Sequence, residues 1–160
     1  MVPTSGGITE EEAGRKGRPM RPPAASVSRR VEGEVLVVDD EASIRELLRS
    51  VLAANGYSVM LAASGADGVM RFAEDPRRVR LVVMDLMMPG ISGAETLAML
   101  KALDPSVKVL MMTGYSGSLE PAFHDPAVVG LILKPFSVPD LLERVQYAWT
   151  SSPDRMIPGV

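Results

Sequence analysis

Residues 34–41 read Glu-Val-Leu-Val-Val-Asp-Asp-Glu, an apolar run that ends abruptly in three acidic residues. A continuous run of aliphatic residues is typical of a strand buried on both faces of a parallel sheet, because a half-exposed strand would alternate apolar and polar residues. In open parallel sheets, functional side chains gather just beyond the carboxyl ends of the strands. This stretch therefore predicts a parallel sheet with an acidic site at one edge.

Four more apolar runs follow, at residues 57–61, 81–84, 107–112 and 128–133. Helical spacing separates them, most clearly in Ile44, Leu47, Leu48, Val51 and Leu52, which fall at i, i+3, i+4, i+7 and i+8. Further helices are expected over 66–73, 94–103 and 137–149, and prolines leave room for only a turn or two of helix in 117–127. The alternation predicts an α/β fold, a doubly wound five-stranded parallel sheet with helices on both faces.

Two helix ends have specific local signals. Gly56 follows the first helical period and is placed to end that helix in the left-handed conformation. The stretch Ser137-Val138-Pro139-Asp140 resembles a capping box, with an acidic residue three positions after the serine. We therefore expect the last helix to begin at Ser137.

The composition excludes several functions. A hydrophobic fraction of 46% and a charged fraction of 23% over 160 residues indicate one globular domain. The net charge of −3 argues against non-specific binding to nucleic acid or to an anionic membrane. The absence of cysteine excludes disulfides and thiolate zinc sites, and the single histidine, His124, cannot form a multi-histidine metal site. Without a signal peptide or an apolar stretch of about 20 residues, a cytoplasmic protein is expected.

The composition also suggests where the folded part begins. Residues 1–32 are rich in Gly, Pro and Arg and show no apolar periodicity, so they are expected to form a disordered leader. Residues 33–150 would form the domain, and residues 151–160 a short tail that is too small for an output domain of its own.

Polar residues follow four of the expected strands and should meet at one edge of the sheet. They are Asp39, Asp40 and Glu41 after the first strand, Asp85 after the third, Thr113 after the fourth and Lys134 after the fifth. Neighbouring carboxylates repel one another unless a cation lies between them, and oxygen ligands favour Mg2+ or Mn2+. A lysine and a hydroxyl would suit a phosphoryl group, for which Asp85 is the natural nucleophile.

The motifs VLVVDDE, MDLMMPGISG, MMTGYS and LILKPF, in this order, resemble the receiver domain of bacterial two-component response regulators. The resemblance covers about residues 34–149 and implies a flavodoxin-like fold that takes a phosphoryl group from a kinase phosphohistidine onto Asp85. It also implies that Asp40, Asp85 and the backbone carbonyl of Met87 ligate Mg2+, and that Asp39 acts through metal-bound water. Lys134 and Thr113 would contact the phosphoryl oxygens, and Pro135 would follow Lys134 through a cis bond.

The resemblance further implies a sensor histidine kinase or a histidine phosphotransfer protein as donor and a downstream protein as target. It leaves the oligomeric state open, with a homodimer among the options, and leaves open whether the chain is a stand-alone regulator or resembles the receivers of hybrid histidine kinases. One position departs from the pattern, because Leu131 stands where the family usually has an aromatic residue in the fifth strand. The usual coupling of that residue to Thr113 is thus modified or absent.

Two other functions remain in view. A receiver-shaped interaction module would need no phosphate, and the change at Leu131 keeps this alternative open. An aspartyl-phosphate phosphatase would also use strand-end carboxylates and magnesium, but its nucleophile should be followed two residues later by an acid, where this chain has Met87. We therefore expect a signalling protein that catalyses only its own phosphoryl transfer and dephosphorylation.

Overall fold

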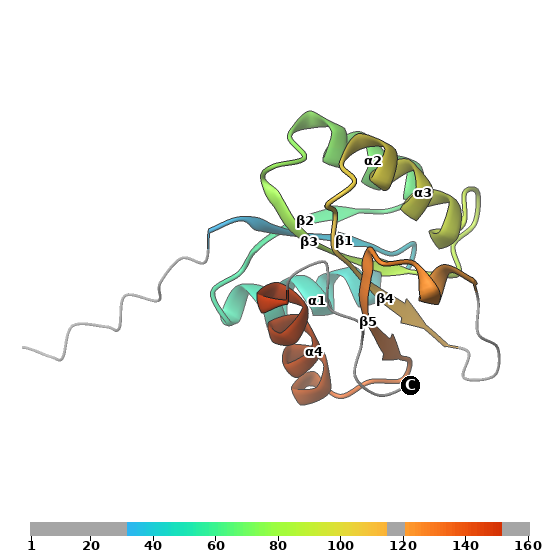
Figure 1. The fold of residues 1–160 in the computed structure, drawn as a ribbon. Coiled ribbons are helices and arrows are strands. Elements are labelled where there is room, and N and C mark those ends of the chain that lie inside the picture. Colours follow the sequence, from blue (N-terminus) through green and yellow to red (C-terminus); the bar gives the residue numbers. More distant parts are fainter. Residues whose placement is uncertain (1–31, 115–120, 152–160) are drawn as a thin grey trace, which may run out of the picture.

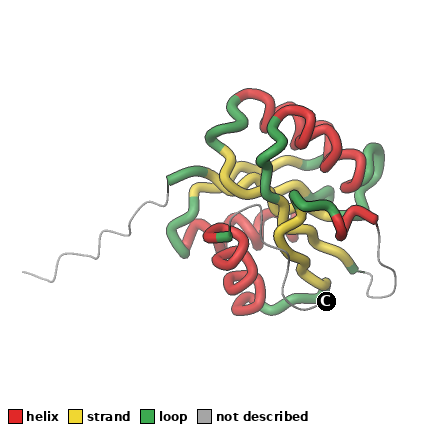
Figure 2. The backbone as a smooth tube through the Cα atoms, viewed as in Figure 1, coloured by secondary structure: helices red, strands yellow, loops and turns green. Residues whose placement is uncertain are grey.

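The computed structural model of the chain describes residues 32–114 and 121–151. Five parallel strands form one sheet in the order β2-β1-β3-β4-β5, and helices cover both of its faces (Figures 1 and 2). The strands are β1 (Glu34–Val38), β2 (Ser58–Ala62), β3 (Val79–Asp85), β4 (Val109–Thr113) and β5 (Val128–Leu133). The helices are α1 (Ala42–Ala54), α2 (Gly65–Glu74), α3 (Gly93–Leu103), the 3-10 turn η1 (Pro121–His124) and α4 (Val138–Thr150).

The five predicted strands form, but the expectation that all of them are buried on both faces is wrong for β2, an edge strand in which only Ala62 is buried. In β1, β3 and β4 nearly every residue is inaccessible to solvent, as expected for central strands with helices above and below. The expected helices also form, and in the described part of the segment with two prolines, from residue 121 onward, lies the 3-10 turn η1. Most of the expected leader and tail lies outside the described residues, so those boundaries stay predictions.

Alternate residues of the central strands point to opposite faces, and this alternation divides the core into two layers. Leu36, Val38 and Met84 pack with Phe72 of α2 and Leu97 of α3 on one face. The other face is covered by α1 and α4, whose buried residues include Leu48, Leu52, Leu141 and Val145. Because both layers are filled, the backbone of the sheet is held rigidly and so are the strand ends.

The two predicted helix-end signals have the expected geometry. Gly56 has φ of 88°, in the left-handed region that favours glycine, directly after α1. The Ser137 side chain accepts a hydrogen bond from the backbone N–H of Asp140 and begins α4. None of the described helices is both long and apolar enough to cross a lipid bilayer.

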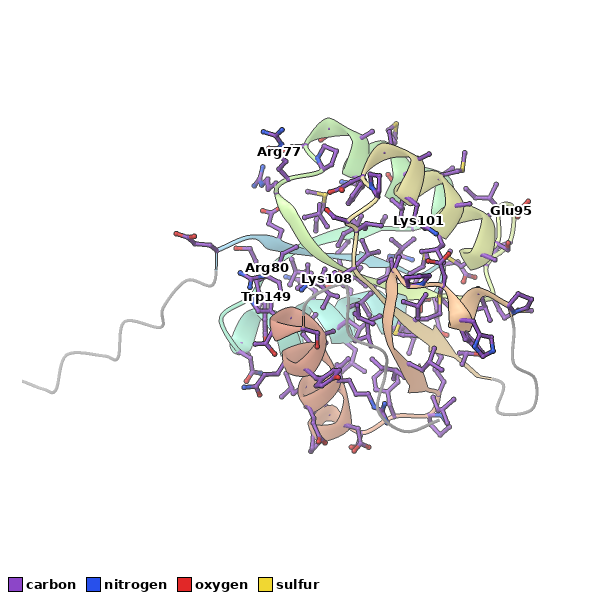
Figure 3. All side chains as sticks on the ribbon, in the orientation of Figure 1. Arg77, Arg80, Glu95, Lys101, Lys108 and Trp149 are labelled. Carbon is purple, nitrogen blue, oxygen red and sulfur yellow. The ribbon has the colours of Figure 1, made fainter. Side chains whose placement is uncertain are left out.

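At the amino-terminal edge of the sheet, one lysine joins the start of β4 to the end of α4. The Nζ atom of Lys108 donates to the carbonyl oxygens of Ala148, Trp149 and Ser151 at 2.9, 3.0 and 3.1 Å. Arg80 lies over the Trp149 ring, 4.9 Å from its centroid, and Figure 3 shows these side chains side by side. A cation at the carbonyl end of a helix stabilises that end.

Removal of the Lys108 ammonium should therefore destabilise the domain. We expect Lys108→Met to lower the free energy of unfolding by about 1–2 kcal/mol, because three helix carbonyls lose a charged donor. Urea denaturation followed by circular dichroism measures the change. Arg49→Met removes a cation from an exposed pair with Glu46 and serves as control, with an expected change below about 0.5 kcal/mol. Equal effects of the two variants would contradict the role given to Lys108.

Candidate functional site

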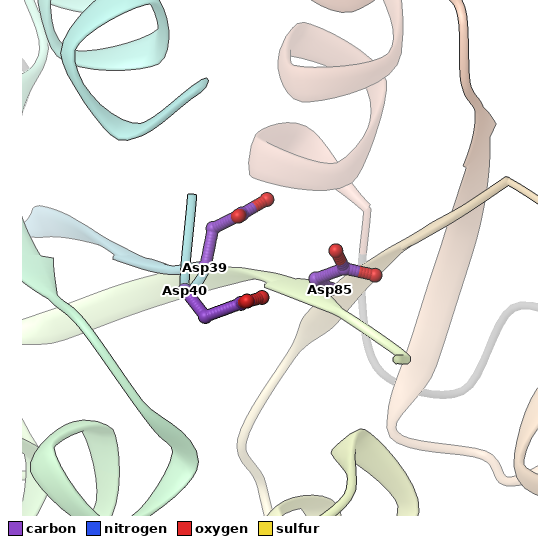
Figure 4. A group of neighbouring side chains, drawn as sticks. All are labelled: Asp39, Asp40 and Asp85. Atoms are coloured by element: carbon purple, nitrogen blue, oxygen red, sulfur yellow. The ribbon is translucent and has the colours of Figure 1, made fainter. Parts of the chain in front are cut away.

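Three carboxylates meet at the carboxyl edge of the sheet. Asp39 and Asp40 follow β1, and Asp85 ends the neighbouring strand β3. One oxygen from each residue lies within 4.8 Å of those of the other two, and Figure 4 shows the three side chains close together beyond the ends of the two strands. Asp39 and Asp85 are buried, whereas Asp40 is exposed. The cluster is thus enclosed by protein around Asp39 and Asp85 and accessible to solvent at Asp40.

Lys134 supplies the positive charge of the site. Its Nζ atom lies 2.7 Å from Asp85 Oδ2 and 3.0 Å from Asp39 Oδ2, so that one ammonium bridges two carboxylates from different strands. Lys134 follows β5 and precedes a cis peptide bond to Pro135. Its backbone N–H donates to the carbonyl oxygen of Thr113, the buried last residue of β4. All residues that the sequence placed at this edge therefore lie there.

Backbone and side-chain hydrogen bonds orient the carboxylates. Asp39 Oδ1 accepts from the backbone N–H of Glu41 at 2.8 Å, and Asp85 Oδ1 accepts from that of Met87 at 3.1 Å. Each carboxylate thus bonds to the residue two positions ahead, which tightens the turn after its strand. Arg45 of α1 reaches back and donates from Nη1 to the carbonyl oxygen of Asp39 at 2.7 Å.

The buried charges change the proton affinities in the site. Burial raises the pKa of Asp39, and the hydrogen bonds from Glu41 and Lys134 offset this only in part. Burial alone would lower the pKa of Lys134, but its hydrogen bonds to Asp85 and Asp39 outweigh burial and raise it. The ammonium is therefore firmly protonated, while the buried Asp39 carboxylate lacks full compensation.

The donor set matches a hard divalent cation. The cluster offers carboxylate oxygens only, which Mg2+ prefers, and its partly uncompensated negative charge favours a cation. Asp40 leaves the cluster open to solvent, as suits an ion that keeps several of its waters. The acidic pocket formed by Asp39, Asp40 and Asp85 thus fits Mg2+.

Two features of the site were not predicted from the sequence. Arg45 was not singled out, and its spacing of six residues from Asp39 gives no signal because its bond goes to a backbone carbonyl. The exposure of Met87 was not foreseen either: its side chain is 72% exposed beside the buried Asp85. Leu131, at the unusual position of β5, is partly buried and packs against the core layer under α2 and α3.

Comparison with known proteins agrees with this geometry. The family model described as response regulator receiver domain matches residues 35–146. The response regulator MprA of Mycolicibacterium vanbaalenii is 37% identical over 113 residues, which are 70% of this chain and 48% of that protein. The chain thus spans about half the length of the curated relatives it matches.

Solved structures give the same result. The receiver domain of the hybrid histidine kinase CckA is 28% identical with a TM-score of 0.63, over 74% of this chain and 100% of that one. The response regulator TrrA from Thermotoga maritima, solved in complex with Mg2+ and BeF, is 32% identical with a TM-score of 0.65, over 72% of this chain and 98% of that one.

This chain therefore belongs to the response regulator receiver domain family. Its five-stranded parallel sheet is that of the CheY-like receivers, as the likeness to CheY4 of Vibrio cholerae shows, with 26% identity and a TM-score of 0.65 over 74% of this chain and 99% of that one. The matched proteins are response regulators, so this chain is a receiver domain of two-component signalling.

The raised pKa of Asp39 predicts how its buried charge affects the stability of the metal-free protein. Because its folded-state pKa lies above the unfolded value, the ionised carboxylate costs stability near neutral pH, and the cost fades as the pH falls through the folded-state pKa. We expect Asp39→Asn to raise the free energy of unfolding near neutral pH, with Lys134 still paired to Asp85. The gain should shrink toward acidic pH.

Urea denaturation in the presence of a chelator, repeated across this pH range, measures the difference. Asp75→Asn is the control, because Asp75 is exposed after α2 and lies outside the acidic cluster. A variant that is less stable than the wild type near neutral pH would show that the Lys134 bond outweighs the burial of the charge.

Proposed function

We propose that this chain accepts a phosphoryl group onto Asp85 from the phosphohistidine of a sensor histidine kinase or a histidine phosphotransfer protein. It then signals through a downstream protein partner. The observation that carries the proposal is the arrangement around Asp85: one carboxylate oxygen contacts the Lys134 ammonium, and two further carboxylates lie beside it. A buried nucleophile between a fixed cation and a metal-binding cluster suits phosphoryl transfer.

Asp85 is the nucleophile of the proposed reaction. One of its carboxylate oxygens bonds to phosphorus while the bond from phosphorus to the donor imidazole nitrogen breaks, and that nitrogen keeps the electron pair. Asp40, Asp85 and the backbone carbonyl of Met87 would hold Mg2+, and Asp39 would act through a metal-bound water. The bound ion would supply positive charge to the phosphoryl oxygens.

Lys134 and Thr113 have distinct parts in this proposal. The Lys134 ammonium would leave its bond to Asp85 for an oxygen of the phosphoryl group, and its raised pKa keeps it charged for that purpose. The Thr113 hydroxyl, at the end of the neighbouring strand β4, would donate to another phosphoryl oxygen. TrrA, a response regulator 32% identical to this chain, was solved with Mg2+ and BeF, which supports a magnesium-dependent site here.

The alternative is a receiver fold that binds its partner without phosphate. Leu131 favours it, because leucine has no ring to turn inward with Thr113 and already packs against the core. The complete acidic cluster with its lysine favours the phosphoryl reaction instead. A phosphatase role has less support, since Met87 offers no acid at the position where such an enzyme needs one.

Phosphorylation by a small donor tests the proposal. We expect acetyl phosphate with Mg2+ to add one phosphoryl group to the intact protein, and chelation of the metal or the substitution Asp85→Asn to abolish the addition. Intact-mass spectrometry measures it. Asp75→Asn should be modified as fully as the wild type. If neither acetyl phosphate nor a phosphorylated histidine kinase modifies the wild type, the phosphate-independent role replaces this proposal.

A further inference from the structure

Helix α3 begins directly against the backbone that carries Asp85. Its first residue is Gly93, and a Cβ atom at this position would lie 2.7 Å from the carbonyl oxygen of Asp85 and 2.7 Å from Cα of Leu86. Carbon atoms do not approach backbone atoms so closely, and backbone cannot turn aside as the end of a flexible side chain can. The space at residue 93 therefore admits a hydrogen and no methyl group.

A hydrogen bond fixes the same contact. The backbone N–H of Gly93 donates to the carbonyl oxygen of Leu86 at 2.9 Å, and the N–H of Leu86 donates to the carbonyl oxygen of Met112 in β4 at 2.9 Å. Leu86 is thus held by α3 on one side and by the sheet on the other. The next residue is Met87, whose N–H orients the Asp85 carboxylate.

The start of α3 is itself anchored. The Ser92 side chain accepts from the N–H of Glu95 at 3.2 Å, and Glu95 Oε2 accepts from the N–H of Ser92 at 2.8 Å, which completes a capping box. The buried side chains of Leu97 and Leu100 hold the helix on the core. The anchored helix start cannot simply move away from a methyl group at residue 93, so part of the displacement would fall on the backbone of Asp85 and Leu86.

We infer that Gly93 is a positioning residue of the metal and phosphoryl site. Its missing side chain lets α3 close on Asp85 and Leu86, and this contact sets where the Asp85 carboxylate and the Met87 carbonyl stand relative to Asp40. The inference rests on the proposed function, in which these groups hold Mg2+. In this inference, helix α3 and the strands together determine the positions of the metal ligands.

The test is Mg2+ binding to the metal-free protein, measured by isothermal titration calorimetry. We expect Gly93→Ala to raise the Mg2+ dissociation constant about tenfold or more, the usual effect of disturbing the groups that orient metal ligands. Gly130→Ala is the control: its Cβ would also be crowded, at 2.9 Å, but only by the end of the Leu110 side chain. The Mg2+ dissociation constant of Gly130→Ala should stay within about twofold of that of the wild type.

A second pair of variants adds no atoms and serves if Gly93→Ala does not fold. Ser92→Ala removes the cap that holds the first turn of α3, and Ser64→Ala removes the equivalent cap of α2, where the Ser64 side chain accepts from the N–H of Asp67. Both changes remove a hydroxyl that caps the first turn of a helix. Only Ser92→Ala should raise the Mg2+ dissociation constant, by less than Gly93→Ala does.

The outcomes separate the inference from the proposed function. A folded Gly93→Ala protein that binds Mg2+ as well as the wild type, or equal effects of the two serine variants, would overturn the inference. A wild type that binds no Mg2+ would overturn it as well. If the wild type binds Mg2+ and Gly93→Ala weakens binding, yet acetyl phosphate never modifies Asp85, the inference stands and the proposed function fails.

Discussion

The burial of two carboxylates, at the ends of two adjacent strands, is the constraint on which the site depends. Asp39 and Asp85 are both buried, and burial deprives a charged carboxylate of its hydration. The Lys134 ammonium, at 2.7 and 3.0 Å, offsets part of this cost, yet the pKa of Asp39 stays raised. The packing of the rest of the domain must outweigh this cost of burial, and the core layers on both faces of the sheet supply that packing.

The proposed chemistry uses the same unfavourable arrangement. A cluster whose negative charge is incompletely offset binds a divalent cation more tightly than a cluster whose charge is fully paired. Burial of Asp39 lowers the stability of the metal-free protein, and binding of the ion would recover that stability. Lys134 has two parts in this picture. Without metal, it reduces the free-energy cost of burying the carboxylate charges. With an ion bound to the carboxylates, its charge would be available to an incoming phosphoryl group.

The strand ends could be predicted from the sequence because parallel strands share one direction. Once 34–38, 81–84 and 128–133 are recognised as buried parallel strands, Asp39, Asp85 and Lys134 must meet at one edge, however far apart they lie in the chain. The contacts of Arg45, Gly93 and Lys108 could not be predicted in this way. In each case a side chain, or a glycine without one, contacts the backbone of another part of the chain. Such contacts depend on the path of a loop and on how closely two elements pack.

The packing of Leu131 bears on how a change at Asp85 could reach other parts of the molecule. Leu131 is partly buried and packs against the core layer under α2 and α3, and it has no aromatic ring to rotate inward. What links β5 to the site is backbone: Thr113 pairs with Leu133, and the N–H of Lys134 donates to the Thr113 carbonyl. A movement of Thr113 or Lys134 toward a phosphoryl group would therefore act on β5 through its ladder to β4. The connection from the site to β5 thus runs through backbone hydrogen bonds, whereas Leu131 offers no aromatic ring for the family's usual coupling.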